Sequence, residues 1–408
     1  MAKEVEFGQI ENCFRFLKSS VADYQKVISK PSRLLYYSLL ALSPILRVLG
    51  VSFFVKSRLK AKLDKTNARD RSLGIVLTEN HLTVVKSLKS IGLSFPYVSF
   101  GLGSSDSEGE CLSVGMLEVL LLSLSQKNFS KIVKASWKND LLIENIPRVV
   151  RIIGLSEIYR LMFDASGSII NFNDHSPDAV LAADMAICDG LKTIYFQHAP
   201  VSEGFPGLYH DVNIIFSEDS LTKYSGIARD GVEVVKFCDV RFLSASTEKS
   251  LGSEGCVLIC PNALDGREEV ISLIRELVSR YTVILRPHPH DKRKWPAISG
   301  CEVSTNRGIW DDLSKCELVV ANESAVVLEA LYAKKKVYKA SFLSASLDSY
   351  GFLKKGLLIK EHFNQSTLVS AIERSDVEYD IDKLGYFIGE PKAPSSAMIK
   401  KIDSLTRV

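Results

Sequence analysis

The sequence has little net charge, no cluster of cysteines and no recognisable signal peptide. Its 51 lysines and arginines nearly balance 48 aspartates and glutamates, which is not the composition of a nucleic-acid-binding protein. The eight cysteines are scattered, and only Cys256 and Cys260 lie close together, so no second pair completes a zinc site. Because no cleavable apolar leader stands among the first 30 residues, we expect a cytoplasmic protein with reduced cysteines.

The composition is otherwise that of a folded globular protein, with 46% hydrophobic and 24% charged residues. A chain of 408 residues has room for two or three domains of about 150 residues each. The near-neutral total hides an uneven distribution, because residues 1–65 carry 12 basic and 5 acidic side chains. The rest of the chain is therefore mildly acidic, and the basic N-terminal segment needs an explanation.

The most apolar stretch of the chain, residues 34–54, lies in this basic segment. About 20 apolar residues can span a bilayer, but Pro44 interrupts a helix, and Arg47 would cost about 2.5–3.5 kcal/mol near the bilayer centre. Basic residues flank the stretch on both sides: Lys26, Lys30, Arg33, Lys56, Arg58, Lys60, Lys62 and Lys65. We expect the segment to lie on an anionic membrane surface. A helical hairpin packed on the protein is the main alternative, and a spanning helix is a third.

From residue 72 onward, short strand-like runs alternate with helical segments, which is the pattern of parallel sheets covered by helices. In the first half, strands are predicted at 73–78, 97–100, 131–134, 169–172, 193–197 and 212–217, and helices at 114–126, 149–164 and 177–188. A polar linker is predicted at 241–255. In the second half, strands are predicted at 256–260, 282–286, 318–321 and 337–339, and helices at 267–279, 324–333 and 395–406.

These elements predict an α/β protein with two Rossmann-like, doubly wound domains that face a central cleft. The predicted parts are a helical N-terminal segment (1–70), an N-terminal domain (71–245), a C-terminal domain (250–390) and a C-terminal helix (391–408). Ligands of such sheets bind beyond the carboxyl ends of the strands, so we expect the functional residues in the strand-end loops.

Three strand-end loops of the second half carry polar residues suited to a nucleotide. Ser324 stands where a helix N-cap belongs, so the N–H groups behind it could bind a phosphate; an ordinary capping serine is the alternative. His288 lies between two prolines that restrict its backbone and could donate to a phosphate oxygen. Glu329 could contact a ribose or merely cover the helix. The predicted nucleotide-binding residues are Asn262, Arg286, His288, Pro289, Asn322, Glu323, Ser324 and Glu329.

Two strand-end loops of the first half carry carboxylates and imidazoles that can act as acid, base or nucleophile. Asp174 and His175 follow one predicted strand, and His198 and Glu203 follow the next, so the four predicted catalytic residues can face one another. An Asx turn is the alternative for Asp174, and a solvated loop carboxylate is the alternative for Glu203.

Taken together, several segments resemble bacterial glycosyltransferases of the two-domain GT-B architecture that build capsule, lipopolysaccharide or teichoic-acid chains. The resembling segments are Asn-Asp-His at 173–175, TIYFQHAPVSEGFP at 193–206, RPHP at 286–289 and NESAVVLEALYAKKKVY at 322–338. The resemblance implies a donor nucleotide bound by the C-terminal domain and an acceptor bound by the N-terminal domain. It also implies catalysis without a metal or other cofactor.

Within that architecture, His288, Pro289 and Ser324 match the residues with which His-Pro transferases of Kdo and sialic acid hold cytidine monophosphate (CMP). The acidic motif of several sialyltransferases is absent. The function implied first is transfer of an ulosonic acid, of Kdo or sialic acid type, from a CMP-activated donor to a glycan or lipid-linked glycan. Asp174 would be the base or nucleophile of this reaction. The protein would act at the inner face of the cell membrane. Alternatives are a CDP-glycerol or CDP-polyol phosphotransferase of teichoic-acid type, a transferase or 2-epimerase of UDP-sugars, and an inactive assembly module.

Overall fold

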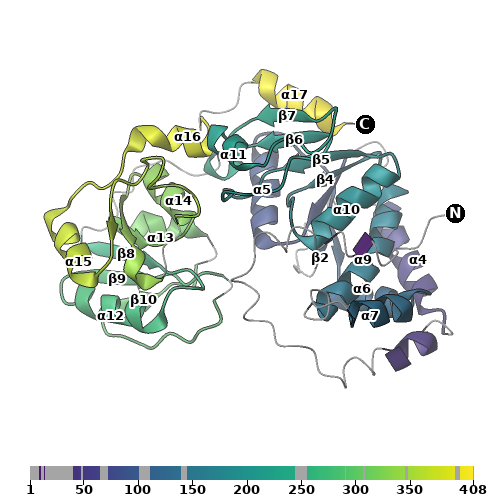
Figure 1. The fold of residues 1–408 in the computed structure, drawn as a ribbon, viewed down its shortest axis with the longest axis horizontal. Coiled ribbons are helices and arrows are strands. Elements are labelled where there is room, and N and C mark those ends of the chain that lie inside the picture. The colour runs from purple at the N-terminus through teal and green to yellow at the C-terminus, as the bar shows by residue number, and fades with distance from the viewer. Residues whose placement is uncertain are drawn as a thin grey trace.

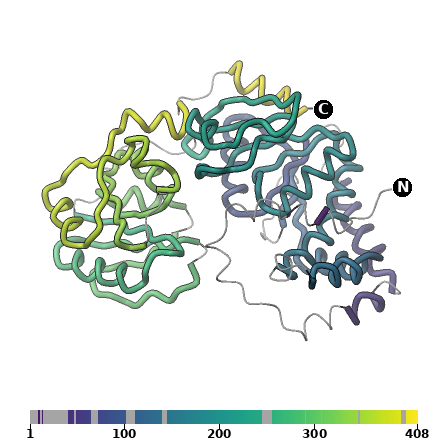
Figure 2. Tube along the Cα trace, in the orientation of Figure 1, coloured from purple at the N-terminus to yellow at the C-terminus, as the bar shows by residue number. Residues whose placement is uncertain are grey.

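A computed structural model describes residues 9–10, 13, 40–46, 49–64, 72–100, 111–138, 145–243, 255–289, 291–306, 308–344, 348–390 and 396–407. These residues build two parallel β-sheets, each with helices packed beside it (Figure 1). The Cα trace in Figure 2 shows that the sheets come from successive parts of the chain, the first in purple and teal, the second in green.

The N-terminal sheet has seven parallel strands in the order β3-β2-β1-β4-β5-β6-β7. Their bounds are β1 (Leu73–Val76), β2 (Tyr97–Phe100), β3 (Cys111–Val114), β4 (Ser168–Asn171), β5 (Lys192–Phe196), β6 (Val212–Ile215) and β7 (Glu233–Lys236). The strand order reverses between β1 and β4. The carboxyl ends of these two strands therefore flank the topological switch point, where doubly wound sheets bind ligands.

Helices accompany this sheet: α5 (Glu79–Ser90), α6 (Met116–Leu124), α7 (Phe129–Ser136), α9 (Ile146–Phe163), α10 (Pro177–Cys188), α11 (Glu218–Lys223) and the 3₁₀ helix η3 (Val240–Phe242). The strand predicted at 131–134 is wrong, because these residues belong to α7. Phe129, Ile132, Val133 and Ser136 are buried with helical spacing. The two edge strands β3 and β7 were not predicted. In β3 every second residue is only half buried, and in β7 only Val235 is buried, so neither forms a continuous apolar run.

The C-terminal sheet repeats the arrangement with six parallel strands in the order β10-β9-β8-β11-β12-β13. The strands are β8 (Cys256–Cys260), β9 (Thr282–Leu285), β10 (Cys301–Val303), β11 (Leu318–Ala321), β12 (Lys336–Ala340) and β13 (Glu361–His362). The helices are α12 (Arg267–Leu277), α13 (Ile309–Lys315), α14 (Val326–Tyr332), α15 (Gln365–Arg374), α16 (Leu384–Ile388) and the 3₁₀ helices η4 (Ser341–Leu343) and η5 (Ile381–Lys383). Here the order reverses between β8 and β11, so each half is a doubly wound α/β unit with its own switch point.

The end of the chain returns to the first half. Helix α17 (Ser396–Thr406) lies beside β7 of the N-terminal sheet (Figure 1). Its Ile402 is buried in the core of that half, and the amide of Ser72 donates to the carbonyl of Thr406 (3.2 Å). The last helix of the chain therefore packs on the N-terminal half, although it follows the C-terminal half in the sequence.

Polar contacts join the two halves near residues 348–355. The ammonium of Lys355 pairs with Asp219 (2.7 Å), and the ammonium of Lys223 donates to the carbonyl of Tyr350 (2.8 Å). The backbones also approach closely: Gly389 has φ +75°, and a Cβ atom there would lie 2.5 Å from the carbonyl oxygen of Phe216. A glycine is therefore needed at this crossing.

The apolar N-terminal segment is described in part, by a helix at Leu40–Leu46 and by α4 (Val51–Leu63). Among the described residues, no single helix is long and apolar enough to cross a membrane. Only these two helices taken together, bent by 69° at their break, satisfy the length and composition of a span.

Candidate active site

The candidate site begins at the carboxyl ends of the adjacent strands β4 and β5, which hydrogen-bond along their length. Asn173 forms the turn after β4, since its Oδ1 atom accepts the backbone amides of His175 (3.0 Å) and Ser176 (2.7 Å). Pro177 then opens α10 with the backbone angle that a first helical turn requires. The Asx turn considered for Asp174 is thus made by Asn173, and the Asp174 side chain remains available to bind His175.

Asp174 and His175 form a hydrogen-bonded pair. The Nδ1–H of His175 donates to Oδ1 of Asp174 (2.9 Å), because an ionised carboxylate can only accept. Asp174 is 3% exposed, whereas the His175 side chain is 37% exposed. Burial alone would raise the pKa of the Asp174 carboxyl, but the hydrogen bond and charge of His175 outweigh it and leave that pKa below its ordinary value. The pair therefore couples a buried, ionised carboxylate to an imidazole that reaches solvent.

His198, which follows β5, lies against a second histidine that the sequence analysis missed. The rings of His198 and His81 are 4.6 Å apart in an edge-to-face arrangement. His81 lies in α5, directly after β1, and its Nδ1 atom accepts the amide of Leu77 (3.2 Å). Its proton must therefore reside on Nε2. Within the described part of the chain, His81 Nε2 and His198 Nδ1 are buried and have no hydrogen-bond partner.

His210 is a fully buried imidazole near Asp174 and was also missed. Its ring stacks on Tyr195 (5.7 Å) and Tyr209 (4.4 Å), and the Tyr209 hydroxyl donates to the carbonyl of Asp174 (3.4 Å). Burial lowers the pKa of His81 to about 3 and that of His210 to about 4. Burial, reinforced by His81, also lowers the pKa of His198 well below its ordinary value. These three imidazoles are therefore neutral near pH 7.

Four of the chain's seven histidines thus gather around Asp174. Two of them, His175 and His198, were predicted from the strand ends, and a further signal was available for His81. Thr78 caps α5 by accepting the amide of His81 (3.3 Å), so a capping threonine after β1 places His81 at the same sheet edge. No comparable signal marks His210, whose proximity depends on the path of the loop between β5 and β6.

Glu203 does not share this environment. It is exposed and pairs with Lys354 of the C-terminal half (2.7 Å). That hydrogen bond and charge lower the pKa of the Glu203 carboxyl. Its loop nevertheless reaches the site, because Phe205 packs edge-to-face on His175 (4.9 Å). The structure thus brings Asp174, His175 and His198 together and uses Glu203 in a contact between the halves.

In the C-terminal half, the loop after β8 is organised by its own side chains. The Oδ1 atom of Asn262 accepts the amides of Leu264 (2.6 Å) and Asp265 (3.0 Å). Asp265 is 2% exposed and accepts the Asn262 amide (2.8 Å) and the Ser344 hydroxyl (2.7 Å). Asn262, predicted to bind nucleotide, therefore acts here as a turn-forming residue.

The polar side chains of the loop after β11 are likewise hydrogen-bonded to other residues of the C-terminal half. Asn322 donates to the Ser344 hydroxyl (2.8 Å) and accepts from Lys339 (3.4 Å). The Glu323 carboxylate pairs with Lys339 and accepts the amides of Asp348 (3.1 Å) and Ser349 (2.9 Å). Glu323 thereby anchors the segment that contacts the N-terminal half.

The helix after this loop differs from the expected one. The expectation that Ser324 is the N-cap is wrong: Ala325 holds that position, and α14 begins at Val326. The first bonds of α14 span three residues rather than four, from Val327 to Ser324 (3.3 Å) and from Leu328 to Ala325 (3.0 Å). The Ser324 hydroxyl still accepts the amide of Val326 (3.3 Å).

Glu329 and Arg286 are both held by oppositely charged partners. The Arg241 guanidinium, which follows the last strand of the N-terminal sheet, pairs with Glu329 (3.1 Å) and with Asp239. Burial raises the pKa of Glu329, and Arg241 opposes that rise. Arg286 pairs with the buried Asp312. The remaining predicted residues, His288 and Pro289, are exposed after β9.

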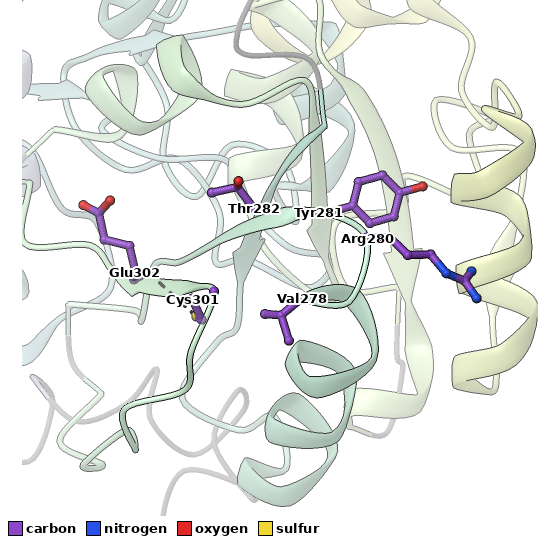
Figure 3. A pocket seen from close by; sticks show the side chains of 7 residues that line it. Val278, Arg280, Tyr281, Thr282, Cys301 and Glu302 are labelled. Atoms are coloured by element: carbon purple, nitrogen blue, oxygen red, sulfur yellow. Dashed lines mark hydrogen bonds between the residues drawn. The ribbon is translucent and has the colours of Figure 1, made fainter.

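Two further features concern the binding of metals and small molecules. Among the described residues, no group of three or more His, Cys, Asp or Glu side chains is placed to hold a metal ion. A surface pocket of about 560 Å³ is lined by residues such as Tyr281, Thr282 and Glu302 (Figure 3). It lies where β9 and β10 begin, at the opposite end of the strands from the site, so it is not the predicted nucleotide site.

No family model matches the chain, and no curated protein matches it. Solved structures are similar in fold. A variant of the wall teichoic acid polymerase TagF matches over 90% of this chain and 97% of its own, with a TM-score of 0.51 and 9% identity. A second TagF variant, with histidine replaced by asparagine and soaked with CDPG, matches over 92% and 98%, with a TM-score of 0.50 and 10% identity.

The UDP-GlcNAc 2-epimerase of Methanocaldococcus jannaschii is also similar, over 81% of this chain and 99% of its own, with a TM-score of 0.50 and 11% identity. At such low identity the likeness is one of fold. Together with the two parallel sheets, it confirms the predicted α/β, two-domain GT-B arrangement.

Proposed function

We propose that this protein is a transferase that moves a group from a cytidine-nucleotide donor to an acceptor hydroxyl and releases CMP. The observation that carries the proposal is the Asp174–His175 pair beside the switch point of the N-terminal sheet. A buried carboxylate that orients a solvent-facing imidazole is the arrangement of a general base. The fold likeness to TagF, which was soaked with CDPG, supports a nucleotide-activated donor.

In this proposal His175 Nε2 accepts the proton of the acceptor hydroxyl. The acceptor oxygen bonds to the transferred group, while the bond from that group to the CMP phosphate breaks and its electron pair leaves with CMP. The Asp174 carboxylate compensates the positive charge that forms on the His175 ring. This assigns the base role to His175 rather than to Asp174, because the Asp174 carboxyl is almost fully buried and one of its oxygens is occupied by His175.

We place a CDP-activated polyol, such as CDP-glycerol, first among the donors. Its electrophile would be the β-phosphorus, and the support is that the TagF likeness covers nearly all of both chains. A CMP-activated ulosonic acid, attacked at its anomeric carbon, is the second donor and rests on the resemblance at His288, Pro289 and Ser324. Both donors release CMP.

The donor nucleotide would bind at the strand-end loops of the C-terminal half. There His288 is exposed, and the Ser324 hydroxyl, which accepts the Val326 amide, can still donate to a phosphate oxygen. Asn262, Asn322 and Glu323 would hold these loops in shape through the bonds described above.

The test combines binding and turnover. Titration calorimetry with CMP, CDP, UMP and UDP should give tighter binding of the cytidine nucleotides. Chromatography should then detect CMP released from CDP-glycerol in the presence of a glycerol-phosphate oligomer, with CMP-Kdo and a glycan as the second pair. Isomerisation of UDP-GlcNAc alone would instead support an epimerase, and binding of no nucleotide would overturn the proposal.

A further inference from the structure

The N-terminal half exposes many large apolar side chains, several of them on the neighbouring helices α4 and α6. Phe53 is 71% exposed, Phe54 70% and Leu117 66%. They belong to a set that we call the apolar face, whose members come from the Leu40–Leu46 helix, the turn after it, α4 and the start of α6: Leu42, Ile45, Leu49, Phe53, Phe54, Met116, Leu117 and Leu120. We propose that the apolar face docks on an anionic phospholipid surface.

Two separate parts of the sequence form this face. Helices α4 and α6 pack against each other, and Arg58 of α4 pairs with Glu118 of α6 (3.6 Å). The sequence analysis had considered residues 34–54 alone. Tertiary structure adds Met116, Leu117 and Leu120, so the exposed apolar area is broader than one helix can offer. Contiguous apolar patches of this kind mark docking sites for membranes or proteins.

Helix α4 is fixed to the protein by its other side. Leu59 and Leu63 are buried in the core of the N-terminal half, and Lys56 pairs with Glu157 of α9. The helix is therefore packed on the body, as one sequence alternative expected, and still presents Phe53 and Phe54 outward. A rigidly held helix with an exposed apolar side suits insertion at a membrane interface.

The basic side chains on the helices of the apolar face favour an anionic lipid surface over a protein as the binding partner. Residues 49–64 and 111–138 hold eight basic and two acidic side chains. The exposed cations lie on α4, just before α7, on α7 and just after it: Arg58, Lys60, Lys127, Lys131, Lys134 and Lys138. Figure 1 shows α6 and α7 adjacent on this side of the molecule. Each such cation near an anionic bilayer contributes about 1 kcal/mol, and apolar side chains beside them can enter the acyl boundary.

The face lies at the edge of the sheet that carries the candidate site. Only Gly115 separates Met116 from the end of β3, so Met116 lies at the same carboxyl edge as Asp174 after β4. Strands β3 and β4 are three positions apart, which is about 14 Å at the usual strand spacing. If the proposed function holds, a lipid-linked acceptor could reach His175 from the docked face; the docking itself does not depend on it.

The test is flotation of the full chain with vesicles of phosphatidylcholine alone or with about 30% phosphatidylglycerol, which gives the bilayer a negative surface potential. We expect at least tenfold stronger partition to the anionic vesicles at about 0.1 M salt, and a severalfold loss at about 0.5 M. The triple variant Phe53→Ser, Phe54→Ser and Leu117→Ser should lose at least tenfold in partition. Ile359→Ser, Phe363→Ser and Val377→Ser, equally exposed residues of the C-terminal half, form the matched control and should bind like the wild type.

Circular dichroism checks that both triple variants remain folded. Equal binding of the first variant and the wild type would overturn the proposal, as would equal binding to both vesicle types. Sedimentation without vesicles provides the remaining outcome: a wild-type dimer that the first variant dissociates would mean that a second copy covers the face, and this too would overturn it. Because the readout is lipid binding, these results are independent of any CMP release.

Discussion

The two halves share a strand order but differ in how they treat the polar residues at their switch points. Between β1 and β4, nitrogen atoms of His81 and His198 are buried without a partner among the described residues. Between β8 and β11, the side chains of Asn262, Asp265 and Asn322 bond to one another or to nearby backbone.

This difference indicates in which half the chemical step would take place. A buried polar group without a partner costs about 1–3 kcal/mol, and such a cost is typically retained where a substrate or a chemical step uses the group. Fully bonded loops instead hold a shape. We therefore propose that the chemistry takes place in the N-terminal half and that Asn262, Asn322 and Glu323 hold the C-terminal loops in shape. Glu329 is the exception in the C-terminal half, since its Oε2 atom is also buried without a partner among the described residues.

The largest expected effect is on turnover and comes from the first half. His175→Ala and Asp174→Asn should each lower CMP release by about 10²–10⁴-fold, because a positioned general base contributes that much. Calorimetry with CMP should give an affinity within about threefold of the wild type, since the donor nucleotide is proposed to bind the other half. Near-normal CMP release by both variants would remove the pair from the mechanism and break the comparison.

Next in size is a pH effect on stability that also arises in the first half. The pKa values of buried His81 and His210 are about 3 and about 4, against an ordinary 6.5, so between these values the unfolded chain binds protons that the folded chain does not. Stability is complete above pH 6.5 and is lost as the pH falls. From pH 7 to pH 5 the loss is about 2 kcal/mol for each histidine.

Urea unfolding at the two pH values, followed by a signal from the N-terminal half, measures this loss. The His210→Phe variant keeps the ring packing on Tyr195 but does not titrate. Because the pKa values of His81 and His198 are also lowered in the folded protein, the pH-dependent loss of stability in this variant should be about two thirds that of the wild type. An unchanged loss in that variant would contradict the burial of a neutral His210.

In the second half the expected effect is on stability alone. Asp265→Ala removes the acceptor of the Asn262 amide and the Ser344 hydroxyl and should destabilise the C-terminal half by about 3 kcal/mol. The exposed Glu276, on the same side of the linker, provides a control: Glu276→Ala should cost less than about 0.5 kcal/mol. Urea denaturation compares the two. If the Asp265→Ala protein were as stable as the wild type but did not bind nucleotide, the loop after β8 would be a ligand site. The polar residues of the two halves would then not differ in function as proposed.

The smallest effect tests the joint between the halves. Lys355 pairs with the buried Asp219, whereas its neighbour Lys354 pairs with Glu203 at the surface. Lys355→Ala should lower the melting temperature by about 2–4 °C, and Lys354→Ala should lower it by less than about 1 °C because exposed ion pairs add little. Differential scanning calorimetry measures both. Equal shifts would mean that the surface pair is as important to the joint as the buried one.

Much of this architecture could be predicted from strand and helix patterns, and part of it could not. The buried runs that became β1, β4, β5, β8 and β11 are continuous and apolar, so their polar ends were visible, Asp174 and His175 included. Edge strand β3 and the helical 131–134 run were missed because half-buried segments have mixed patterns. His81 was missed because it lies inside an amphipathic helix, and only the capping Thr78 before it indicates that it stands at the sheet edge.

The sequence by itself determined the alternation of elements, the strand-end loops and the basic apolar N-terminal segment, because these depend on local spacing and composition. Only the tertiary structure decided which polar groups are satisfied. Parallel strands that are neighbours in the sheet are separated by whole helices in the chain, so the meeting of His81 with His198, and of α4 with α6, follows from strand order. The packing of the two halves against each other likewise brings Arg241, after the last strand of the N-terminal sheet, to Glu329 of the C-terminal half.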